Sequence, residues 1–453
     1  MSGKQPNIIL INCDDLGYGD LGCYGSTMNK TPHVDKLAEE GMLFTDFYAV
    51  SPVCSASRGG MMTGCYPPRI GFGSFEGWGV LFPGQGVGLS QDEQTIAGVL
   101  KNAGYKTMHI GKWHCGDQPD FLPTRHGFDK YYGLPYSNDM GRQVSNVPWP
   151  APPLPLLQDD EVIQQQPDLA ALTERYTEQA IGFIRENQSN PFFLYLAHMY
   201  VHLPHYAPEH FIKNSNNGDF GAVMGCLDWS VQALMHELKV CGLDEDTLVI
   251  FTSDNGGKAT HGGTNWPLRG KKGTTWEGGM RVPCIARWPG KIPKGSVNRE
   301  LACSLDFFAT LAKLAGAVPG TDNIIDSLDM SDSMFGGDNP RKEFFYYRLN
   351  NLEAVRSGKW KLKIKDGNSE LKLLYDLEAD IGENENVYNE NPQIVEALTR
   401  LLDSCREDLG DEAAGVTGKN VRSIGKVDNP VPLTIYDPDH PYFAAMYDKG
   451  DRG

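Results

Sequence analysis

Four apolar runs, each followed closely by polar side chains, constrain the fold of this chain most strongly. The runs cover residues 7–12, 105–110, 191–197 and 248–252. Runs of this length, rich in Ile, Val, Leu and Phe, are typical of parallel strands that are buried on both faces. Amphipathic helical patterns lie between them, as in residues 220–240. The alternation predicts an α/β fold with a mixed, mostly parallel sheet flanked by helices. Ser90 and Glu93 form a capping-box pattern that predicts a helix through Leu100, and the proline-rich stretch 147–157 predicts an ordered loop or a surface crossover.

Side chains with useful chemistry follow each run by one to five residues. They are Asp14 and Asp15 after the first run, Lys112 and His114 after the second, His202 after the third, and Asp254 and Asn255 after the fourth. In an open parallel sheet, ligands bind at the edge where the carboxyl ends of the strands meet. We therefore expect these groups from distant segments to lie together at that edge.

Carboxylate and amide oxygens dominate this set. Asp14, Asp15 and Asp254 supply charged oxygens and Asn255 a neutral one, and these are the hard ligands that Ca²⁺ and Mg²⁺ prefer. Asp and Asn are also favoured in turns, so each motif by itself is compatible with a purely structural role. Gly256 and the glycine after it would let the backbone approach closely.

A cysteine and an arginine lie one helical turn apart in Cys54-Ser-Ala-Ser-Arg58. A helix that begins beside Cys54 would present free N–H groups and a partial positive charge to that side chain. Arg58 would then offer a planar fork to an anion attacked by the residue at position 54. A buried structural thiol is the alternative, because free cysteines are commonly buried.

The pentapeptide Cys54–Arg58 resembles the signature of the type I sulfatases, Cys-x-Pro/Ala-x-Arg. Residues 7–25, Gly111-Lys-Trp-His114 and the glycine-rich segment 268–281 resemble further motifs of that family. The resemblance covers most of the first 335 residues. It implies an alkaline-phosphatase-like fold and a sulfuric ester hydrolase. It also implies that Cys54 is oxidised to formylglycine, an aldehyde whose hydrate attacks sulfur.

The same resemblance implies a metal site. Asp14, Asp15, Asp254 and Asn255 would hold a divalent cation, Ca²⁺ or alternatively Mg²⁺, with position 54 completing the ligand set. Arg58 and the cation would favour the ionised form of the aldehyde hydrate.

Catalytic and substrate-binding roles also follow from the resemblance. Lys112 and Lys272 would bind sulfate oxygens, and Ser137, in the loop 133–139, would contact the sulfate. His202 would protonate the leaving alcohol. His114 would then take a proton from the second hydroxyl, so that sulfate leaves and the aldehyde re-forms.

Three histidines follow the third apolar run, at His198, His202 and His205. Their spacing fits a zinc site on a helix, but Pro204 and Pro208 exclude a continuous helix there. We therefore expect His202 alone to be catalytic, with His198 and His205 supporting the site or facing the substrate.

Strand–helix alternation stops near residue 336, which predicts three parts. Residues 1–335 would form the catalytic domain. Short strand patterns and a helical pattern then predict an antiparallel sheet and a helix in residues 336–410. The polar tail, residues 411–453, would pack on the body or on a sister subunit of a homo-oligomer.

The net charge and the apolar content of the chain limit the kinds of molecule that it can bind. A net charge of −17 disfavours nucleic acid and other extended polyanions, so we expect a sulfated small molecule or a glycan chain end. Trp78, Trp149 and Trp266 are candidates for stacking on sugar rings. No apolar run approaches the roughly 20 residues of a membrane span. Ten scattered cysteines indicate thiols in a reducing compartment.

The first six residues indicate the cellular compartment, and the Cys54–Arg58 motif indicates how Cys54 is modified. Met-Ser-Gly-Lys-Gln-Pro contains no signal peptide pattern. This predicts a cytoplasmic protein as written, or a periplasmic or secreted one if a signal peptide has been removed. Ala56 stands where oxygen-dependent maturation prefers proline. The resemblance therefore implies a bacterial source and a formylglycine-generating maturase of the anaerobic radical type.

Two alternative functions stay open at this point. A phosphoesterase or phosphonate monoester hydrolase of the same superfamily would share the fold, but its metal site usually carries extra histidines. A non-catalytic sulfated-glycan receptor would not need Lys112, His114 and His202 together.

Overall fold

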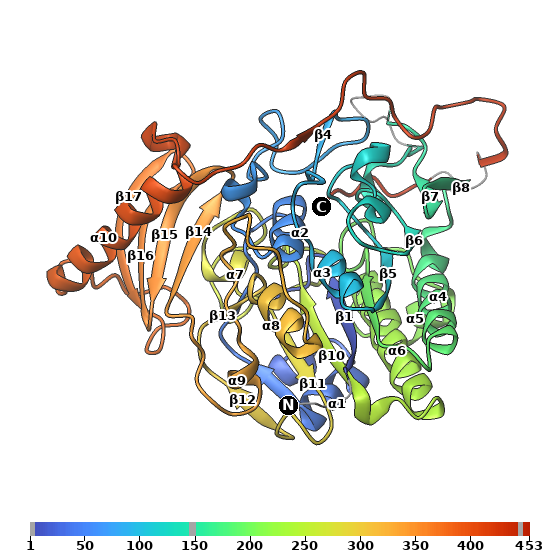
Figure 1. The fold of residues 1–453 in the computed structure, drawn as a ribbon, viewed down its shortest axis with the longest axis horizontal. Helices are drawn as coiled ribbons and strands as arrows, with labels where there is room; N and C mark the ends of the chain where they lie inside the picture. Colours follow the sequence, from blue (N-terminus) through green and yellow to red (C-terminus); the bar gives the residue numbers. More distant parts are fainter. Residues whose placement is uncertain (1–4, 145–150, 443–446) are drawn as a thin grey trace.

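A ten-stranded sheet crosses the middle of the molecule in this computed structural model, which describes residues 5–144, 151–442 and 447–453 (Figure 1). The strand order is β12-β2-β11-β10-β1-β9-β5-β6-β7-β8. The four predicted runs form mutually parallel central strands, namely β10 (Thr247–Ser253), β1 (Asn7–Cys13), β9 (Phe192–Ala197) and β5 (Lys106–Gly111).

Shorter strands extend this sheet on both sides. On one side lie β11 (Cys284–Arg287), β2 (Met42–Phe44) and β12 (Ser296–Asn298), and on the other β6 (Lys130–Gly133), β7 (Pro155–Gln158) and β8 (Glu161–Gln165). Because β11 runs antiparallel to β10, and β7 antiparallel to β6, the sheet is mixed but mostly parallel at its centre. Two-stranded pairs join β3 (Phe47–Tyr48) with β13 (Ala302–Cys303), and β4 (Val87–Gly88) with β18 (Gly425–Lys426).

Helices cover both faces of the sheet because alternate residues of its central strands point to opposite sides. Ile8 and Leu10 pack in one apolar cluster, and Ile9 and Ile11 pack in another. The first face is covered by α2 (Cys54–Thr63), α3 (Ile96–Asn102) and α8 (Asp306–Ala315). The second is covered by α1 (Pro32–Glu40), α4 (Leu172–Glu186) and α6 (Gly218–Val240). Within the described ranges, no helix has the length and apolarity needed to span a bilayer.

The other helices are short, apart from the last. They are α5 (Glu209–Asn214), α7 (Glu277–Met280), α9 (Ser331–Met334) and the long α10 (Pro392–Leu409). α10 packs Leu398 and Leu402 into an apolar cluster with Phe344 and Leu362. Phe344 and Leu362 belong to a four-stranded antiparallel sheet beside the main body, drawn in orange in Figure 1. Its strands are β14 (Glu343–Arg348), β15 (Asn351–Ser357), β16 (Trp360–Asp366) and β17 (Ser369–Asp376).

The described parts of the C-terminal tail, residues 411–442 and 447–453, lie along the same chain's body. Strand β18 pairs with β4, and the Val144 N–H donates to the carbonyl of Tyr447 at 2.8 Å. Figure 1 shows this segment crossing the top of the molecule and returning so that residue 453 lies near α2. The divisions at residues 335 and 410 stay predictions.

Two local expectations differ from the structure. Residues 90–93 resemble a helix-capping box, but they form a turn in which Glu93 N–H donates to the Ser90 carbonyl at 3.1 Å. The side chain of Glu93 pairs instead with Arg422 at 2.7 Å, and α3 begins at Ile96 with Thr95 as its cap. The proline-rich stretch 147–157, expected as a loop, ends in β7. Trp149 lies outside the described residues.

Candidate active site

The carboxyl ends of the four central strands meet at one edge of the sheet. Ser253 pairs with Cys13, and Ala197 lies opposite both Asn12 and Gly111. Backbone hydrogen bonds continue past the strand ends, from Asp254 N–H to the Cys13 carbonyl at 3.0 Å and from Lys112 N–H to the Ala197 carbonyl at 2.8 Å. The polar groups that follow these strands therefore lie next to one another at this edge of the sheet.

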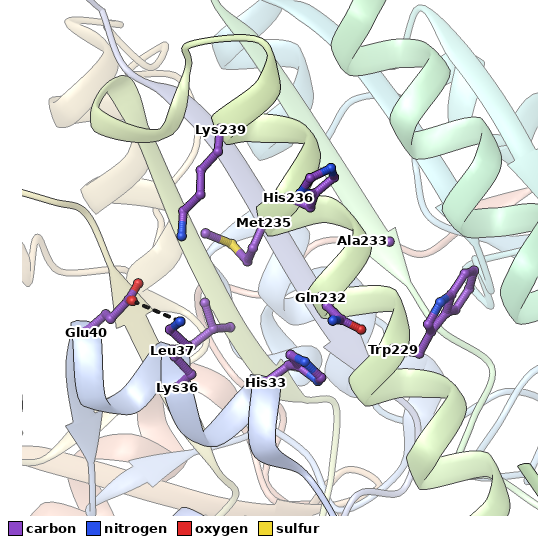
Figure 2. Close-up of a pocket in the computed structure, with 10 residues that line it drawn as sticks. All are labelled: His33, Lys36, Leu37, Glu40, Trp229, Gln232, Ala233, Met235, His236 and Lys239. Carbon is purple, nitrogen blue, oxygen red and sulfur yellow. Dashed lines mark ion pairs between the residues drawn. The ribbon is translucent and has the colours of Figure 1, made fainter.

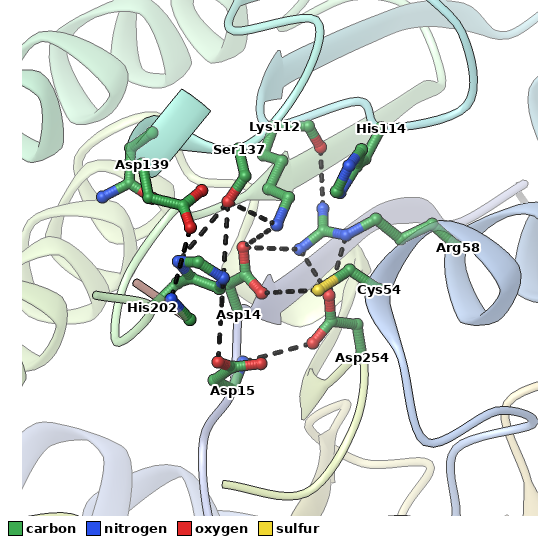
Figure 3. Close-up of polar contacts among 12 residues, drawn as sticks. Asp14, Asp15, Cys54, Arg58, Lys112, His114, Ser137, Asp139, His202 and Asp254 are labelled. Carbon is green, nitrogen blue, oxygen red and sulfur yellow. Dashed lines mark hydrogen bonds and ion pairs between the residues drawn. The ribbon is translucent and has the colours of Figure 1, made fainter. Parts of the chain in front are cut away.

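Cys54 is the first residue of α2 and reaches this edge from a separate segment. Its Sγ lies 3.4 Å from Asp14 Oδ1 (Figure 3). Burial and the Asp14 carboxylate raise the pKa of the Cys54 thiol. Ligand atoms of Asp14, Asp15, Cys54 and His202 all lie within 4.8 Å of one another. Cys54 is thus part of the polar cluster, although it is also buried as the alternative interpretation required.

The predicted metal ligands are held by one another. Asp254 Oδ1 accepts the Asp15 N–H at 3.2 Å, and Asn255 Nδ2 donates to Asp15 Oδ1 at 2.8 Å. Asn255 Oδ1 is buried and has no hydrogen-bond partner within the described residues. A buried amide oxygen without a donor is costly unless something else satisfies it. Together with three carboxylates, this oxygen fits a hard divalent cation.

Two glycines allow this crowding. A Cβ atom on Gly256 would lie 1.9 Å from the carbonyl oxygen of Gly278, and one on Gly257 would lie 3.0 Å from Gly17 Cα. Since real Cβ atoms do not approach backbone so closely, only glycine brings the residues after Asn255 against the neighbouring segments.

Two lysines balance the carboxylates, Lys112 with a fully buried side chain and Lys272 with 11% of its side chain exposed. Lys112 Nζ donates to Asp14 Oδ2 and also lies 3.2 Å from Ser137 Oγ. Lys272 Nζ lies 3.0 Å from Asp15 Oδ2. Burial opposes the charged form of both lysines, but the carboxylates prevail and raise the pKa of each ammonium. Conversely, burial opposes ionisation of Asp14, but Lys112, His202 and Arg58 lower its pKa.

Arg58 differs from the prediction that its fork would face an anion. Its Nε and Nη2 both contact Asp254 Oδ2 at 2.8 Å, and its Nη1 donates to the Lys112 carbonyl at 2.7 Å. The guanidinium is fully buried and does not line the pocket, and its Nη2 also lies 3.7 Å from Asp14 Oδ2. Arg58 therefore positions Asp254 and the Lys112 segment.

His114 and His202 have defined tautomers, because each ring faces a carbonyl that can only accept. His114 Nε2–H donates to the Leu81 carbonyl at 3.0 Å, and its buried Nδ1 has no partner within the described residues. His202 Nδ1–H donates to the Leu203 carbonyl at 2.6 Å, while its Nε2 lies 3.9 Å from Asp15 Oδ2. Burial, followed by the charge of a nearby lysine, lowers the pKa of both rings, so each keeps one nitrogen lone pair for proton exchange.

The other two histidines do not reach the pocket. His198 Nε2 lies 3.4 Å from Ser230 Oγ in α6, and His205 Nε2–H donates to the Val201 carbonyl at 2.8 Å. Neither lines the pocket, so neither faces a substrate there, and the alternative that they support the site stays a prediction.

A pocket of about 410 Å³ opens above Cys54. His114, Ser137, His202 and Lys272 line it, as do Trp78, Phe82, Asp139, Met140, Lys258, Arg452 and Gly453. Trp78 lines the pocket, where its ring packs edge-to-face against Phe82 at 5.2 Å between ring centroids. Trp266 is 69% exposed and does not line the pocket.

Several lining residues were not singled out by the sequence analysis, among them Asp139, Lys258 and Arg452. Asp139 follows Ser137 by two positions, and this proximity was the available signal. Lys258, Arg452 and the rest of the tail carry no local pattern that points to the site.

A second cavity, of about 460 Å³, contains none of the predicted site residues (Figure 2). It is a groove between α1 and α6, lined by His33, Lys36, Leu37, Glu40, Trp229, Gln232, Ala233, Met235, His236 and Lys239. Its side chains form one helical ion pair, Lys36–Glu40 at 3.8 Å, and Figure 2 shows no cluster of converging ligands.

Comparison with known proteins identifies the family. A model of the sulfatase family matches residues 6–317. The chain belongs to the sulfatase family. A second model, for the C-terminal part of N-sulphoglucosamine sulphohydrolase, matches residues 270–408 of this sulfatase. It is therefore a sulfuric ester hydrolase.

Individual relatives agree with this assignment. Arylsulfatase A of Homo sapiens is 40% identical over 447 residues, covering 88% of this sulfatase and 87% of the relative. N-acetylgalactosamine-6-sulfatase of Canis lupus familiaris is 39% identical over 376 residues, covering 79% and 71%. The crystal structure of Ps i-CgsB in complex with k-i-k-neocarrahexaose superposes with a TM-score of 0.79 at 31% identity, covering 88% of this sulfatase and 92% of that chain.

A phosphonate monoester hydrolase of Agrobacterium radiobacter also has this fold. Its TM-score is 0.63 at 20% identity, covering 88% of this sulfatase and 95% of that chain. At this identity the likeness concerns the fold alone. The predicted alkaline-phosphatase-like architecture is thus confirmed.

Proposed function

We propose that this sulfatase removes sulfate from a sulfated carbohydrate or an aryl sulfate, and that Cys54 is converted to formylglycine, whose hydrate supplies the attacking oxygen. The observation that carries the proposal is the position of Cys54. It begins a helix and lines a pocket, its Sγ lies 3.4 Å from Asp14 Oδ1, and the ammonium groups of Lys112 and Lys272 pair with Asp14 and Asp15. A residue needed only for packing would not require this surrounding.

The metal site in this proposal consists of Asp14, Asp15, Asp254 and Asn255, with Ca²⁺ as the ion and Mg²⁺ as the alternative. A divalent cation there would supply positive charge next to the ester. The oxygen-only protein donors and the unpaired Asn255 Oδ1 support an alkaline-earth ion over zinc.

Lys112, Lys272 and Ser137 would bind the sulfate oxygens. Their polar atoms already surround the space above Asp14 and Asp15, with Ser137 Oγ 3.2 Å from Lys112 Nζ. Because Lys112 and Lys272 are paired with carboxylates and Ser137 Oγ lies beside Lys112, these donors need little reorganisation when charge develops on the ester oxygens.

His202 would act on the leaving oxygen. Its Nδ1–H is held by the Leu203 carbonyl, so Nε2 is the nitrogen that exchanges a proton. An arriving sulfate anion would raise the pKa of the ring, since negative charge favours the imidazolium form. The protonated Nε2 can then donate to the departing alcohol.

His114 would act as the base at position 54. Its Nε2–H is held by the Leu81 carbonyl, and its Nδ1 lone pair is unused within the described residues. A neutral imidazole with one free nitrogen, lining the same pocket as Cys54, suits proton removal from a hydroxyl.

The rival phosphoesterase or phosphonate monoester hydrolase has less support. The one cluster of possible metal ligands in the described part of the chain contains a single histidine, His202, and Asn255 stands beside Asp254 where such enzymes usually carry a histidine. A non-catalytic glycan receptor would not need His114 and His202 in one pocket, each with one ring nitrogen held by a backbone carbonyl.

The partners in this proposal are a sulfated small molecule or glycan chain end and a maturase of the anaerobic radical type. The test is co-expression with such a maturase, followed by mass spectrometry of the peptide that contains Cys54. We expect the mass of the aldehyde, and aryl sulfate turnover that exceeds aryl phosphate turnover.

Cys54→Ala is the matched control, since it keeps the helix start and removes the modifiable atom. It should retain the fold and lose turnover. Fully converted protein that binds sulfated sugars without turnover would favour the receptor. Faster turnover of aryl phosphate would favour the phosphoesterase.

A further inference from the structure

The segment Tyr447–Gly453 enters the active-site pocket. Tyr206 anchors it, because its hydroxyl accepts the N–H groups of Asp448 at 3.1 Å and Lys449 at 2.9 Å. Lys449 Nζ also pairs with Asp219 at 2.8 Å. These contacts lead the following residues over the pocket, so that Arg452 and Gly453 form part of its lining.

The main chain of Arg452 and Gly453 contacts two pocket side chains. The Gly453 N–H donates to Asp139 Oδ2 at 3.3 Å, and Lys258 Nζ donates to the Arg452 carbonyl. A Cβ atom on Gly453 would lie 1.9 Å from His202 Nε2, so this residue touches the ring directly. A peptide unit therefore occupies the place next to the nitrogen that would protonate the leaving oxygen.

Asp139 is a nearly buried carboxylate in the pocket lining, beside His202. Its side chain is only 7% exposed, and Figure 3 shows its carboxylate on the His202 side of the cluster. One of its oxygens, Oδ1, has no hydrogen-bond partner within the described residues. A buried carboxylate oxygen without a donor is unfavourable, and the pocket beside it is where a donor from a ligand can enter.

The peptide unit shows which chemistry fits here. It presents one N–H donor to Asp139 and, in the opposite direction, one carbonyl acceptor to Lys258, and both groups are uncharged. A hydroxyl or acylamino group on a sugar ring offers the same donors and acceptors. Trp78 borders the pocket and is 58% exposed, which leaves its ring surface available for the apolar face of a sugar.

We propose that Asp139 and Lys258 are specificity-determining residues that bind the sugar ring carrying the sulfate ester. Asp139 accepts from a hydroxyl or acylamino N–H next to the ester, and Lys258 donates to a neighbouring oxygen. The substrate class is a sulfated sugar residue with polar substituents beside the ester, and the tail yields its place to that ring. This inference rests on the proposed sulfatase reaction at the same pocket.

The test compares two substrates, a sulfated N-acetylhexosamine and 4-nitrophenyl sulfate, on the fully matured enzyme. The measured quantity is the ratio of kcat/KM for the sugar sulfate to kcat/KM for the aryl sulfate. Asp139→Asn and Lys258→Met should each lower this ratio by about tenfold to a hundredfold, the usual range for losing a hydrogen bond to a charged group. Most of the change should appear in KM of the sugar sulfate.

Asp160→Asn is the matched control, because Asp160 is an exposed carboxylate paired with Arg125 at 2.8 Å away from the pocket lining. It should leave the ratio unchanged. Asp139→Asn conserves shape, and if it fails to fold, Lys258→Met carries the test alone. An unchanged ratio in a folded variant would overturn this inference. A parent enzyme that hydrolyses neither substrate would instead overturn the proposed function.

Discussion

The buried ammonium of Lys361 connects the C-terminal sheet to the loop that carries Lys272. Its Nζ donates to the Thr275 carbonyl at 2.9 Å and pairs with Glu277 at 2.9 Å and Glu383 at 2.8 Å. The side chains of Lys361 and both glutamates are fully buried. Lys361→Met, which keeps the length of the side chain, should therefore be strongly destabilising.

The size of the expected loss of stability follows from the two glutamates that Lys361 would leave without their common partner. Burial opposes ionisation of Glu277, but Lys361, Arg281 and Arg356 lower its pKa to about 2. Burial and the charge of Glu277 raise the pKa of Glu383. Without Lys361, two buried carboxyl groups face each other, and breaking a buried pair in this way costs about 3–5 kcal/mol.

The assay is urea unfolding at pH 7, with the free energy of unfolding taken from the midpoint and slope. Lys359→Met is the matched control, since Lys359 pairs with Asp376 at 2.5 Å on the exposed side of the same sheet. Exposed pairs contribute little, so this variant should behave like the parent. Adding Glu277→Gln to Lys361→Met should recover part of the loss, because one buried charge is removed.

Equal stability of Lys361→Met and Lys359→Met would refute this reasoning. So would a double variant that is less stable than Lys361→Met alone by the full cost of another lost pair. Slower turnover in folded Lys361→Met would further indicate that the loop position of Lys272 depends on the C-terminal sheet.

Two further predictions concern metal and pH. Removing divalent cations with a chelator should lower the midpoint of thermal unfolding, because Asp14, Asp15 and Asp254 then repel one another; Ca²⁺ at about 100 times its Kd should restore about 2.7 kcal/mol, and an unchanged midpoint would contradict the metal site. Burial raises the pKa of Asp117 from its ordinary 3.8 to about 6, so its contribution to stability is full below pH 3.8 and is lost as pH rises through about 6. Asp117→Asn, which keeps an acceptor for the Gly84 N–H, should therefore stabilise the fold by up to about 3 kcal/mol at pH 8 and little at pH 4 in urea titrations; equal gains at both pH values would contradict this.

The central sheet and the gathering of polar groups at its edge could be predicted from short segments. Apolar runs such as residues 7–12 report burial on both faces, and residues just beyond a parallel strand emerge at its carboxyl end. The thiols were also predictable, since all ten cysteines lie in the described ranges, none forms a disulfide, and most are buried. Lys272 and Ser137 were predicted as site residues from the motif resemblance, because neither directly follows an apolar run that predicts a strand.

Other features depend on contacts between distant segments. Glu93 completes a local capping pattern, yet it pairs with Arg422 across 329 positions of sequence, and the predicted helix start is lost. Arg58 suits an anion by its chemistry, but it pairs with Asp254, which lies 196 positions further along the chain. For Glu93, a partly buried ion pair outweighs a local capping preference of about 1 kcal/mol, and for Arg58 a distant carboxylate decides where the guanidinium lies.

The sequence by itself determined the positions of the four central strands, the set of groups at the sheet edge and the Cys54–Arg58 motif, because burial pattern and residue chemistry are local properties. Only the tertiary structure decided which side chains those groups bind and that the tail returns to the pocket. The contact between Gly453 and Asp139 joins residues 314 positions apart, and no local pattern encodes such a contact. It arises from anchors like Tyr206 that exist only once the body has folded.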